Sequence, residues 1–415
     1  MIKIGLLNIQ NVDNYGANLI AYSMEQELKQ IGLSDIEITT LNFCPDIHIS
    51  SMQATSIINA YRQFGIIGSV KSIKRSANRS RRYFLRQVRS TILFKTAKKI
   101  IRRGKLSNAV FDDDSDKKKR QERFDTFHKE YLNLTEKFTS ANMDLQKYDI
   151  IIVGSDVVWK PARLLAKEEN KVYFLLNTDR CKKIAYAASI GINDDNVLGR
   201  LKKRYAEAID RFDYISVRER SAKRYIQSLL PHRDVMNCID PVFLRSPEEY
   251  LKLITDLNLE KKDYIYVYLM GNNQKAYQYA SKLATEKHLS IIYYTNFACP
   301  NLFGESSITD GPCEFLHRIY YAKYIVTDTF HGTAFSLIFR KKFITFTRGN
   351  MSIRLVDFLT GIGLKDRLVE SVEDMALIDN PIDYDAISDK IEDWASLSRL
   401  WLQNAVRASA ESLNI

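Results

Sequence analysis

The sequence is poor in residues that cross-link or interrupt a chain. It has five cysteines, with no CxxC pair and no His at zinc-finger spacing. They are Cys44, Cys181, Cys238, Cys299 and Cys313. Scattered cysteines of this kind indicate a reducing cytosol and argue against a disulfide scaffold or a structural metal site. With 16 Gly and 8 Pro in 415 residues, 45% of them hydrophobic, the chain is expected to fold as two domains or one large one.

Long apolar runs are also absent. No stretch approaches the roughly 18 uncharged apolar residues that a membrane-spanning helix needs. The N-terminal segment MIKIGLLNIQ is followed by Asn11, Asp13 and Asn14 instead of a small-residue cleavage site. We therefore expect a cytoplasmic protein with neither a signal peptide nor a membrane span.

Acidic residues are missing between Asp46 and Asp112. This window contains 15 of the 61 Lys and Arg residues, and the other 46 are outnumbered by 50 acidic residues. The net charge of +11 therefore comes from one segment, and the rest of the chain is mildly acidic. A nucleic-acid function for the whole protein does not follow from its charge.

The basic residues of this window, at 62–105, alternate with apolar residues at roughly helical spacing. This pattern predicts a basic helical insertion at about 50–120. Three interpretations stay open: a solvated flap, a surface that binds an anionic membrane or a lipid-linked pyrophosphate, and a nucleic-acid site. Nucleic acid is the least favoured, and we expect no nucleic-acid partner.

Apolar runs of strand length alternate with helical patterns along the rest of the chain, which predicts βαβ units and parallel sheets. Strands of the first half are expected at 3–9, 36–41, 149–153, 183–187, 214–217 and 235–238, and helices at 17–31, 196–211 and 219–230. Strands of the second half are expected at 264–270, 290–294, 324–327 and 342–345, and helices at 247–257, 273–288, 313–322 and 331–339. We predict two Rossmann-like domains, 1–240 and 241–383. A helical extension at 384–415 is expected to pack back across the first.

Polar loops follow several of these strands, where ligands of open α/β sheets bind. The segment Asn14-Tyr15-Gly16-Ala17-Asn18 separates the first strand from the first helix. Its glycine permits close backbone approach, and amides at the helix start suit an oxyanion or a sugar hydroxyl. An ordinary tight turn explains it equally well. No GxGxxG or P-loop pattern occurs, which removes the main support for a dinucleotide or P-loop site.

Two further strand ends carry polar groups. Ser155 and Asp156 are expected to contact sugar hydroxyls, with Asp156 as a base or, alternatively, only a helix N-cap. Arg218 presents a planar fork suited to a carboxylate or phosphate, or else forms a salt bridge with Glu219 or a neighbouring acid. Arg220 and Arg224, inside the following helix, are expected to be solvated.

The second half has a similar strand end. His331 stands at a helix N-terminus beside Gly332, an arrangement that suits a phosphate, and Asp328 is placed to orient the imidazole. A lone His is more often structural, but its place at the ligand edge favours function. Ser352 and Arg354 offer another hydroxyl and guanidinium, with function and structure about equally supported.

Taken together, these segments resemble the polysaccharide pyruvyl transferase family. The matching stretches are NYGAN, VGSDVVW, IAYAASIG, ISVRERSA, CIDPVFL, the run from Gly311 to Phe339, and SIRLVDFLTGIGLKDRLV. The resemblance spans nearly the whole chain except the basic insertion and about the last 30 residues. Ala17 stands where many members have Asp, and Thr329 where Ser is frequent, so the first loop has a weaker claim to an acidic role.

The resemblance implies a GT-B-like fold and transfer of the pyruvyl group of phosphoenolpyruvate to two sugar hydroxyls, giving a cyclic ketal and phosphate. It implies Arg218 for the carboxylate or phosphate, His331 for phosphate binding or proton delivery, and Asp156 as a third catalytic residue. The substrate-binding residues it implies are Asn14, Tyr15, Gly16, Asn18, Ser155, Ser189, Asp328, Thr329, Gly332, Thr333, Ser352 and Arg354. No metal or cofactor is expected.

The expected acceptor is a galactose or related hexose of a lipid-linked repeat unit in capsular or exopolysaccharide biosynthesis. The basic segment 62–105 would hold the enzyme at the inner face of the membrane, where such an acceptor lies. A nucleotide-sugar glycosyltransferase on the same scaffold is the alternative enzyme class.

Overall fold

The computed structural model describes most of the chain outside the basic window. The described residues are 1–44, 114–139, 144–164, 172–191, 201–259, 262–296, 303–347, 353–373 and 375–413. The predicted insertion, up to residue 113, and Ser352 lie outside them. Both halves described below belong to one compact unit, residues 1–44 and 113–415. The boundaries at 240 and 383 stay a prediction.

The first half is built on a parallel sheet in the order β2-β1-β3-β4-β5-β6. Its strands are β1 (Ile2–Leu7), β2 (Ile36–Thr40), β3 (Ile150–Val153), β4 (Lys182–Ala188), β5 (Tyr214–Val217) and β6 (Val235–Asn237). All four residues of β3 are buried, as expected for a strand covered on both faces. The accompanying helices are α1 (Tyr15–Lys29), α5 (Lys202–Asp210) and α6 (Arg220–Leu229). Helix α1 begins two residues before the predicted start because Asn14 caps it.

The second half repeats the design in the order β12-β11-β10-β7-β8-β9. Its strands are β7 (Tyr264–Leu269), β8 (Ser290–Thr295), β9 (Glu305–Ser306), β10 (Tyr324–Thr327), β11 (Lys342–Phe346) and β12 (Leu368–Val369). Its helices are α7 (Pro247–Lys252), α8 (Gln274–Lys287), α9 (Pro312–Tyr321), α10 (Phe330–Ile338) and α11 (Ile353–Ile362). The helix expected at 247–257 is shorter, because the chain turns at Leu253. Two parallel-sheet α/β domains are therefore confirmed.

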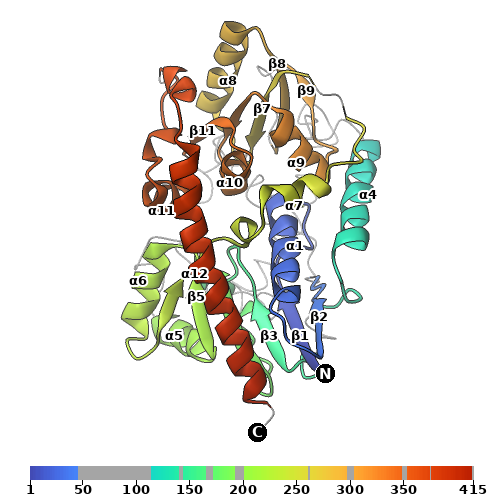
Figure 1. Cartoon of the computed structure of the whole chain (residues 1–415), viewed down its shortest axis with the longest axis vertical. Coiled ribbons are helices and arrows are strands. Elements are labelled where there is room, and N and C mark those ends of the chain that lie inside the picture. The colour runs from blue at the N-terminus through green and yellow to red at the C-terminus, as the bar shows by residue number, and fades with distance from the viewer. Residues whose placement is uncertain are drawn as a thin grey trace, which may run out of the picture. The chain divides into compact units, whose positions relative to one another are not determined.

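The long helix α12 (Tyr384–Glu411) packs back across the first half, as expected (Figure 1). Its Ser398 Oγ accepts from the amide of Ile239 at 3.0 Å, and Arg407 donates to the carbonyl of Ile31 at 3.0 Å. It is one continuous helix, and its upper part also contacts α11 of the second half.

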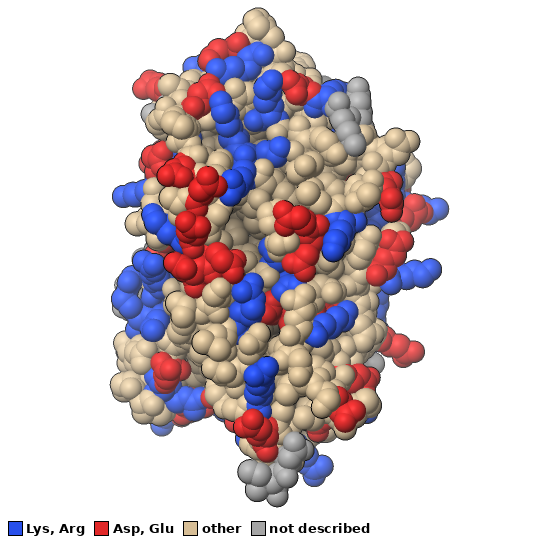
Figure 2. Space-filling model, viewed as in Figure 1, with Lys and Arg blue, Asp and Glu red and all other residues tan. Residues whose placement is uncertain are grey.

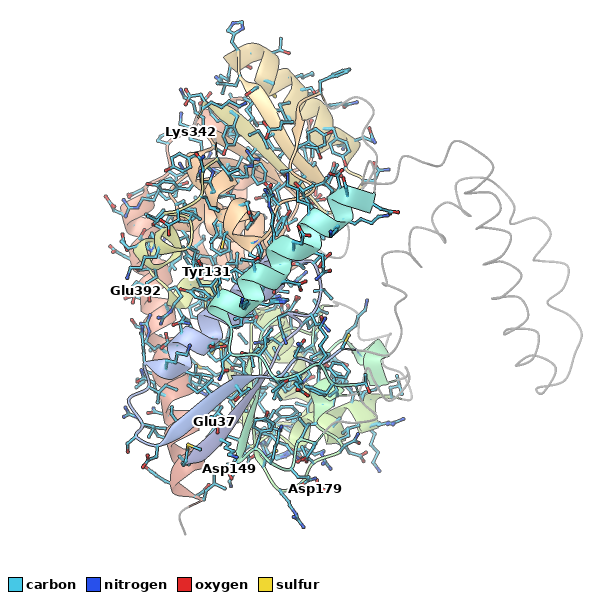
Figure 3. The ribbon with its side chains drawn as sticks, turned by 90° about the vertical axis from the view of Figure 1, so that its right-hand side faces the viewer. Glu37, Tyr131, Asp149, Asp179, Lys342 and Glu392 are labelled. Carbon is cyan, nitrogen blue, oxygen red and sulfur yellow. The ribbon has the colours of Figure 1, made fainter. Side chains whose placement is uncertain are left out.

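Helix α4 (Asp114–Tyr131) ties the two halves together (Figure 3). Its Arg120 is only 2% exposed, and Nη1 donates to the Tyr15 hydroxyl (2.7 Å) and to the carbonyls of Ile308 (3.0 Å) and Asp310 (2.9 Å). The Tyr15 ring in turn stacks on Phe315 of α9, with ring centroids 4.7 Å apart. The start of α1 is thereby fixed against the second half.

Candidate active site

The carboxyl ends of the first sheet meet around one buried carboxylate. Asp240 Oδ2 accepts from Ser155 Oγ at 3.3 Å and from Arg218 Nη1, while Oδ1 accepts from the amide of Val242 at 3.2 Å. Ser155 follows β3, Arg218 follows β5 and Asp240 follows β6. Neighbouring parallel strands end at the same sheet edge, so residues far apart in sequence become one cluster.

Arg218 is the buried cation of this cluster. Its Nε lies 3.5 Å from Glu219 Oε1, and its guanidinium carbon lies 4.8 Å from the centroid of the Phe330 ring, which belongs to the second half. Burial acts to lower the pKa of Arg218, but the carboxylates of Asp240, Glu219 and Asp156 outweigh it and raise the pKa. Nη2 is buried without a hydrogen-bond partner among the described residues. The group is a fixed positive charge with donor capacity left over.

His331 faces this cluster from the second half. The N-cap of α10, Thr329, accepts from the amide of Gly332 at 2.9 Å and places His331 in the first turn. The imidazole Nε2 lies 3.9 Å from Asp240 Oδ2 and has no hydrogen-bond partner in the described structure. Burial, assisted by Arg218 and Arg354, lowers the pKa of His331 to about 4 despite the nearby carboxylates. The unliganded imidazole is therefore neutral near pH 7.

Gly16 brings the two halves into contact at the imidazole. A Cβ at this position would lie 1.9 Å from His331 Nδ1, a distance that no side chain can occupy. The absence of a side chain therefore lets the first turn of α1 lie directly against the ring. The close approach at Gly16 is to a histidine of the opposite half, and its contact with a substrate stays a prediction.

Asp156 and Arg354 form an ion-pair contact close to Arg218 and His331. Asp156 has φ 93°, a left-handed value that strains a non-glycine residue, and its Oδ1 lies 3.7 Å from Arg354 Nη1. Burial acts to raise the pKa of Asp156, but Arg354, Arg218 and His331 outweigh it and lower the pKa. The N-cap alternative is wrong, because the next helical element is the short 3-10 helix at Pro161–Leu164. Asp156 is instead an ionised carboxylate beside the arginines.

A small pocket opens to solvent at this cluster. The residues that line it are Arg218, Glu219, Arg220, Asp240, Phe330, Arg354, Asp357, Phe358 and Trp394. Both halves and the C-terminal helix α12 contribute to the lining. Its lining carries three arginines and three carboxylates.

The other residues predicted around the first loop have structural partners. Asn14 Oδ1 accepts from the amide of Ala17 at 3.1 Å as the cap of α1, and Tyr15 accepts from Arg120. Asn18 Nδ2 donates to the Asn14 carbonyl at 2.9 Å, and its Oδ1 is 2.5 Å from His128 Nε2. Their contact with an acceptor stays a prediction.

The same holds for most of the predicted residues around α10. The carboxylate of Asp328 accepts from the amides of Met270 (2.8 Å) and Gly271 (2.9 Å) and so holds the end of β7. Thr333 Oγ1 is buried and pairs with Thr345 Oγ1 at 2.7 Å. The carboxylate that forms the long ion-pair contact with the imidazole is Asp240, which was not predicted.

Two buried polar groups at the first sheet edge have no partner in the described part of the chain. Both polar atoms of the Asn8 side chain and the hydroxyl of Ser189 lack hydrogen bonds. Ser189 was predicted, but Asn8 was missed. The sequence signal for Asn8 was its place directly after the first strand. In the structure Asn8 lies against Gly154, where an added Cβ would be 1.6 Å from Asn8 Oδ1. Unsatisfied buried groups at a ligand edge are suited to bind substrate.

Asp240 was also missed, because Asp240-Pro241 reads as the boundary between the halves. Trp394 was missed because its helix shows only an amphipathic pattern. A carboxylate at the end of a strand was the available signal for Asp240, whereas nothing in the sequence places Trp394 near Arg218.

A family model for polysaccharide pyruvyl transferase matches residues 14–350. The chain belongs to the polysaccharide pyruvyl transferase family. This matched region contains Gly16, Asp156, Arg218, Asp240 and His331. The expected family is confirmed, and it supports a transferase of polysaccharide biosynthesis. No curated protein matches the chain.

One solved structure with a TM-score above 0.5 shares the fold. UDP-N-acetylglucosamine 2-epimerase from Rickettsia bellii is 11% identical, with a TM-score of 0.51, covering 100% of this chain and 98% of its own. UDP-GlcNAc 2-epimerase from Neisseria meningitidis is 9% identical, with a TM-score of 0.46, covering 100% and 99%. The Rickettsia likeness shows a GT-B-like fold and nothing about substrate.

The surface of the described residues is mixed in charge. Figure 2 shows acidic and basic side chains interspersed over one face. Among these residues no helix combines the length and apolarity needed to cross a bilayer.

Proposed function

We propose that this enzyme transfers the pyruvyl group of phosphoenolpyruvate to two hydroxyls of a sugar, forming a cyclic ketal and releasing phosphate. One observation carries the proposal: Arg218 and Asp240 of the first half line a pocket with Arg354, and His331 of the second half lies 3.9 Å from Asp240. Membership of the family supports the pyruvyl transfer. The acceptor proposed is a galactose-type hexose of a lipid-linked repeat unit in capsular or exopolysaccharide synthesis.

The donor brings a carboxylate and a phosphate, so its site needs fixed cations. Arg218 has a buried N–H without a partner, and Arg354 stands beside Asp156 at the same pocket. Charge-assisted bonds from these guanidiniums orient the donor without further rearrangement, because Asp240 and Glu219 already hold Arg218 in place. The amides at the start of α10 add favourable dipoles for the phosphate.

His331 supplies the proton in this proposal. A bound phosphate dianion raises the pKa of an adjacent imidazole, so the ring gains a proton as the donor arrives. The imidazolium then protonates the methylene carbon of the donor, and C2 gains cation character and accepts the oxygen of the first hydroxyl. The C2–O bond to phosphate breaks as the second hydroxyl oxygen bonds to C2.

Two hydroxyl protons must leave during these steps. The ionised carboxylate of Asp156 accepts the first, and the departing phosphate carries away the second. The first proton returns from Asp156 through solvent to the imidazole for the next turnover, so protons balance over the cycle. Asp240 touches neither reacting atom in this scheme and positions Arg218.

The basic segment 62–105 is proposed to hold the enzyme against an anionic membrane. Its composition supports this, since it has many basic residues and no acidic one. Vesicles containing anionic lipid should retain the protein at low salt, and neutralising six of these Lys and Arg should release it. Unchanged retention after neutralisation would remove the idea.

The donor is tested first, by calorimetric titration of phosphoenolpyruvate into the wild type, Arg218→Gln and His331→Asn. We expect wild-type binding that Arg218→Gln abolishes and that His331→Asn weakens less. The matched control is Arg224→Gln, an exposed arginine on the same helix α6. Phosphate release on adding a galactoside then reports turnover. Absence of wild-type binding, together with binding of a nucleotide sugar, would replace this proposal with the glycosyltransferase.

A further inference from the structure

Arg220 is a guanidinium at the pocket without an acidic partner. It lines the pocket together with Arg218 and Arg354, and those two have ion-pair contacts with Asp240 and Asp156, respectively. Arg220 makes no ion pair or hydrogen bond with any residue in the described ranges, and it is exposed. It therefore keeps all its donors for something that enters from solvent.

The Arg220 guanidinium nevertheless has neighbours on two sides that restrict its position. Its guanidinium carbon lies 6.0 Å from the centroid of the Trp394 ring, and the Trp394 indole N–H donates to the carbonyl of Asn237 at 2.9 Å. On the other side lies α11, where a Cβ added at Gly361 would be 3.4 Å from Arg220 Nη2. An arginine supported on both sides loses less conformational entropy on binding than a free one.

The acids of the pocket are largely engaged with other groups. Asp357 Oδ2 accepts from the amide (3.1 Å) and the hydroxyl (2.8 Å) of Ser221, and Asp240 is bonded to Arg218. Buried Arg218 Nη2 and buried Glu219 Oε2 each lack a partner within the described part of the chain. Arg220 is also the first residue of α6, whose positive dipole end faces the same side. Among the described residues the unused donors at the pocket are therefore Arg218 Nη2 and the whole guanidinium of Arg220, and the unused acceptor is Glu219 Oε2.

This side of the pocket lies partly outside the family match. The model for the family ends at residue 350, whereas Trp394 and Gly361 lie beyond it. Arg220 itself lies within the match, so what lies beyond it is the support that positions this guanidinium.

We propose that Arg220, positioned by Trp394, forms an anion subsite for the acceptor, which binds a carboxylate or phosphate carried by the acceptor sugar. This inference rests on the proposed function, in which the buried Arg218 and His331 hold the donor. The exposed Arg220 then contacts the acceptor. Trp394 is a positioning residue, because it acts through the guanidinium.

The experiment compares three acceptor probes with the same free hydroxyls at saturating phosphoenolpyruvate: methyl galactoside, carboxymethyl galactoside and galactose 1-phosphate. Wild type should prefer one charged probe over the neutral one in kcat/KM, and which probe wins identifies a carboxylate or a phosphate as the anion. In Arg220→Gln this preference should fall about tenfold, as expected for loss of a charge-assisted hydrogen bond. The control Arg224→Gln should keep it.

Trp394 gives the positioning test. Trp394→Leu should lower the preference, and Trp394→Phe, which keeps an aromatic face, should restore most of it. A merely structural role for Trp394 would change kcat/KM for all three probes equally. That result would overturn the positioning role.

Two outcomes overturn the inference while leaving the proposed function intact. One is a wild type without any preference between charged and neutral probes. The other is Arg220→Gln weakening phosphoenolpyruvate binding as strongly as Arg218→Gln does, which would assign Arg220 to the donor. If wild type binds no phosphoenolpyruvate, the proposed function fails. Direct calorimetry with galactose 1-phosphate then still decides whether Arg220 binds an anion.

Discussion

The two sheet edges bring different chemistry to the candidate active site. The first edge carries charges that are bonded to each other before a ligand arrives, since Asp240 holds both Arg218 and Ser155. The second edge carries His331, whose Nε2 has no hydrogen bond within the described structure. The first half thus presents charged groups that are already held in place. The second half presents an imidazole that is free to bind a ligand or transfer a proton.

Removing the buried carboxylate of Asp240 from the first edge should lower the free energy of unfolding more than any other substitution below. Asp240→Ala leaves the buried Arg218 without its main partner, and loss of one member of a buried ion pair costs about 3–5 kcal/mol. We expect the free energy of unfolding in urea to fall by that amount. Asp385→Ala, at an exposed carboxylate, is the control and should change it by less than about 0.5 kcal/mol. Equal effects of the two would mean that Asp240 is not the anchor.

Acidification should test the second edge. The pKa of His331 is about 4 in the fold against an ordinary value of 6.5, so the unfolded chain binds more protons between these pH values. Stability contributed by the neutral imidazole is therefore present above about pH 6.5 and is lost as the pH falls toward 4, by about 3 kcal/mol in total. His331→Asn should flatten the pH dependence of unfolding over this window. An unchanged slope would contradict a buried neutral imidazole.

Gly16→Ala should disturb the contact between the two edges. The added methyl would lie 1.9 Å from His331 Nδ1, and such overpacking costs about 1–3 kcal/mol. We expect turnover to fall more than stability, because the imidazole must move. Gly361→Ala, a helical glycine with nothing nearer than 3.4 Å, is the stability control.

A double mutant locates the clash. Gly16→Ala combined with His331→Ala should be destabilised by less than the sum of the single effects, because the ring that clashes is gone. Strict additivity would show that the two residues do not touch.

Asn14→Ala should have the smallest effect and distinguish the two roles suggested for this loop. Loss of the cap of α1 costs about 1 kcal/mol, and Asn14→Ser should recover most of it. A cap alone predicts a fall in stability with little change in the KM for acceptor. A large rise in KM for both variants would instead support the predicted acceptor contact.

Much of the fold could be predicted, because buried strands of a parallel sheet are continuous apolar runs. The residues of β3 and the turn at Asn14 are examples, and both lie where expected. Arg218 could be singled out because it directly follows a predicted strand, and His331 because it begins the predicted helix after one. The alternative considered for Arg218, a salt bridge with Glu219 or another acid, is present in the structure and serves to hold the guanidinium in place.

The remaining parts depend on contacts between distant segments. Arg120 stands in the charged run DKKKRQER, which indicates a solvated helix, yet it is among the most buried side chains of the described chain. Arg220 was expected to be solvated and is exposed, but only the arrival of α12 from the far end of the chain makes it part of a pocket. A local sequence pattern cannot predict a contact with a segment that lies far away in the chain.

The bonds of Arg120 have a consequence for comparing sequences. Three of its acceptors are the backbone carbonyl oxygens of Asp13, Ile308 and Asp310, which any residue at those positions would supply. Substitutions there leave the acceptors in place, so these positions have little reason to covary with position 120. A statistical search for coevolving pairs would therefore overlook the contact that joins the halves, and an unvarying arginine in an otherwise variable helix is the signature to look for.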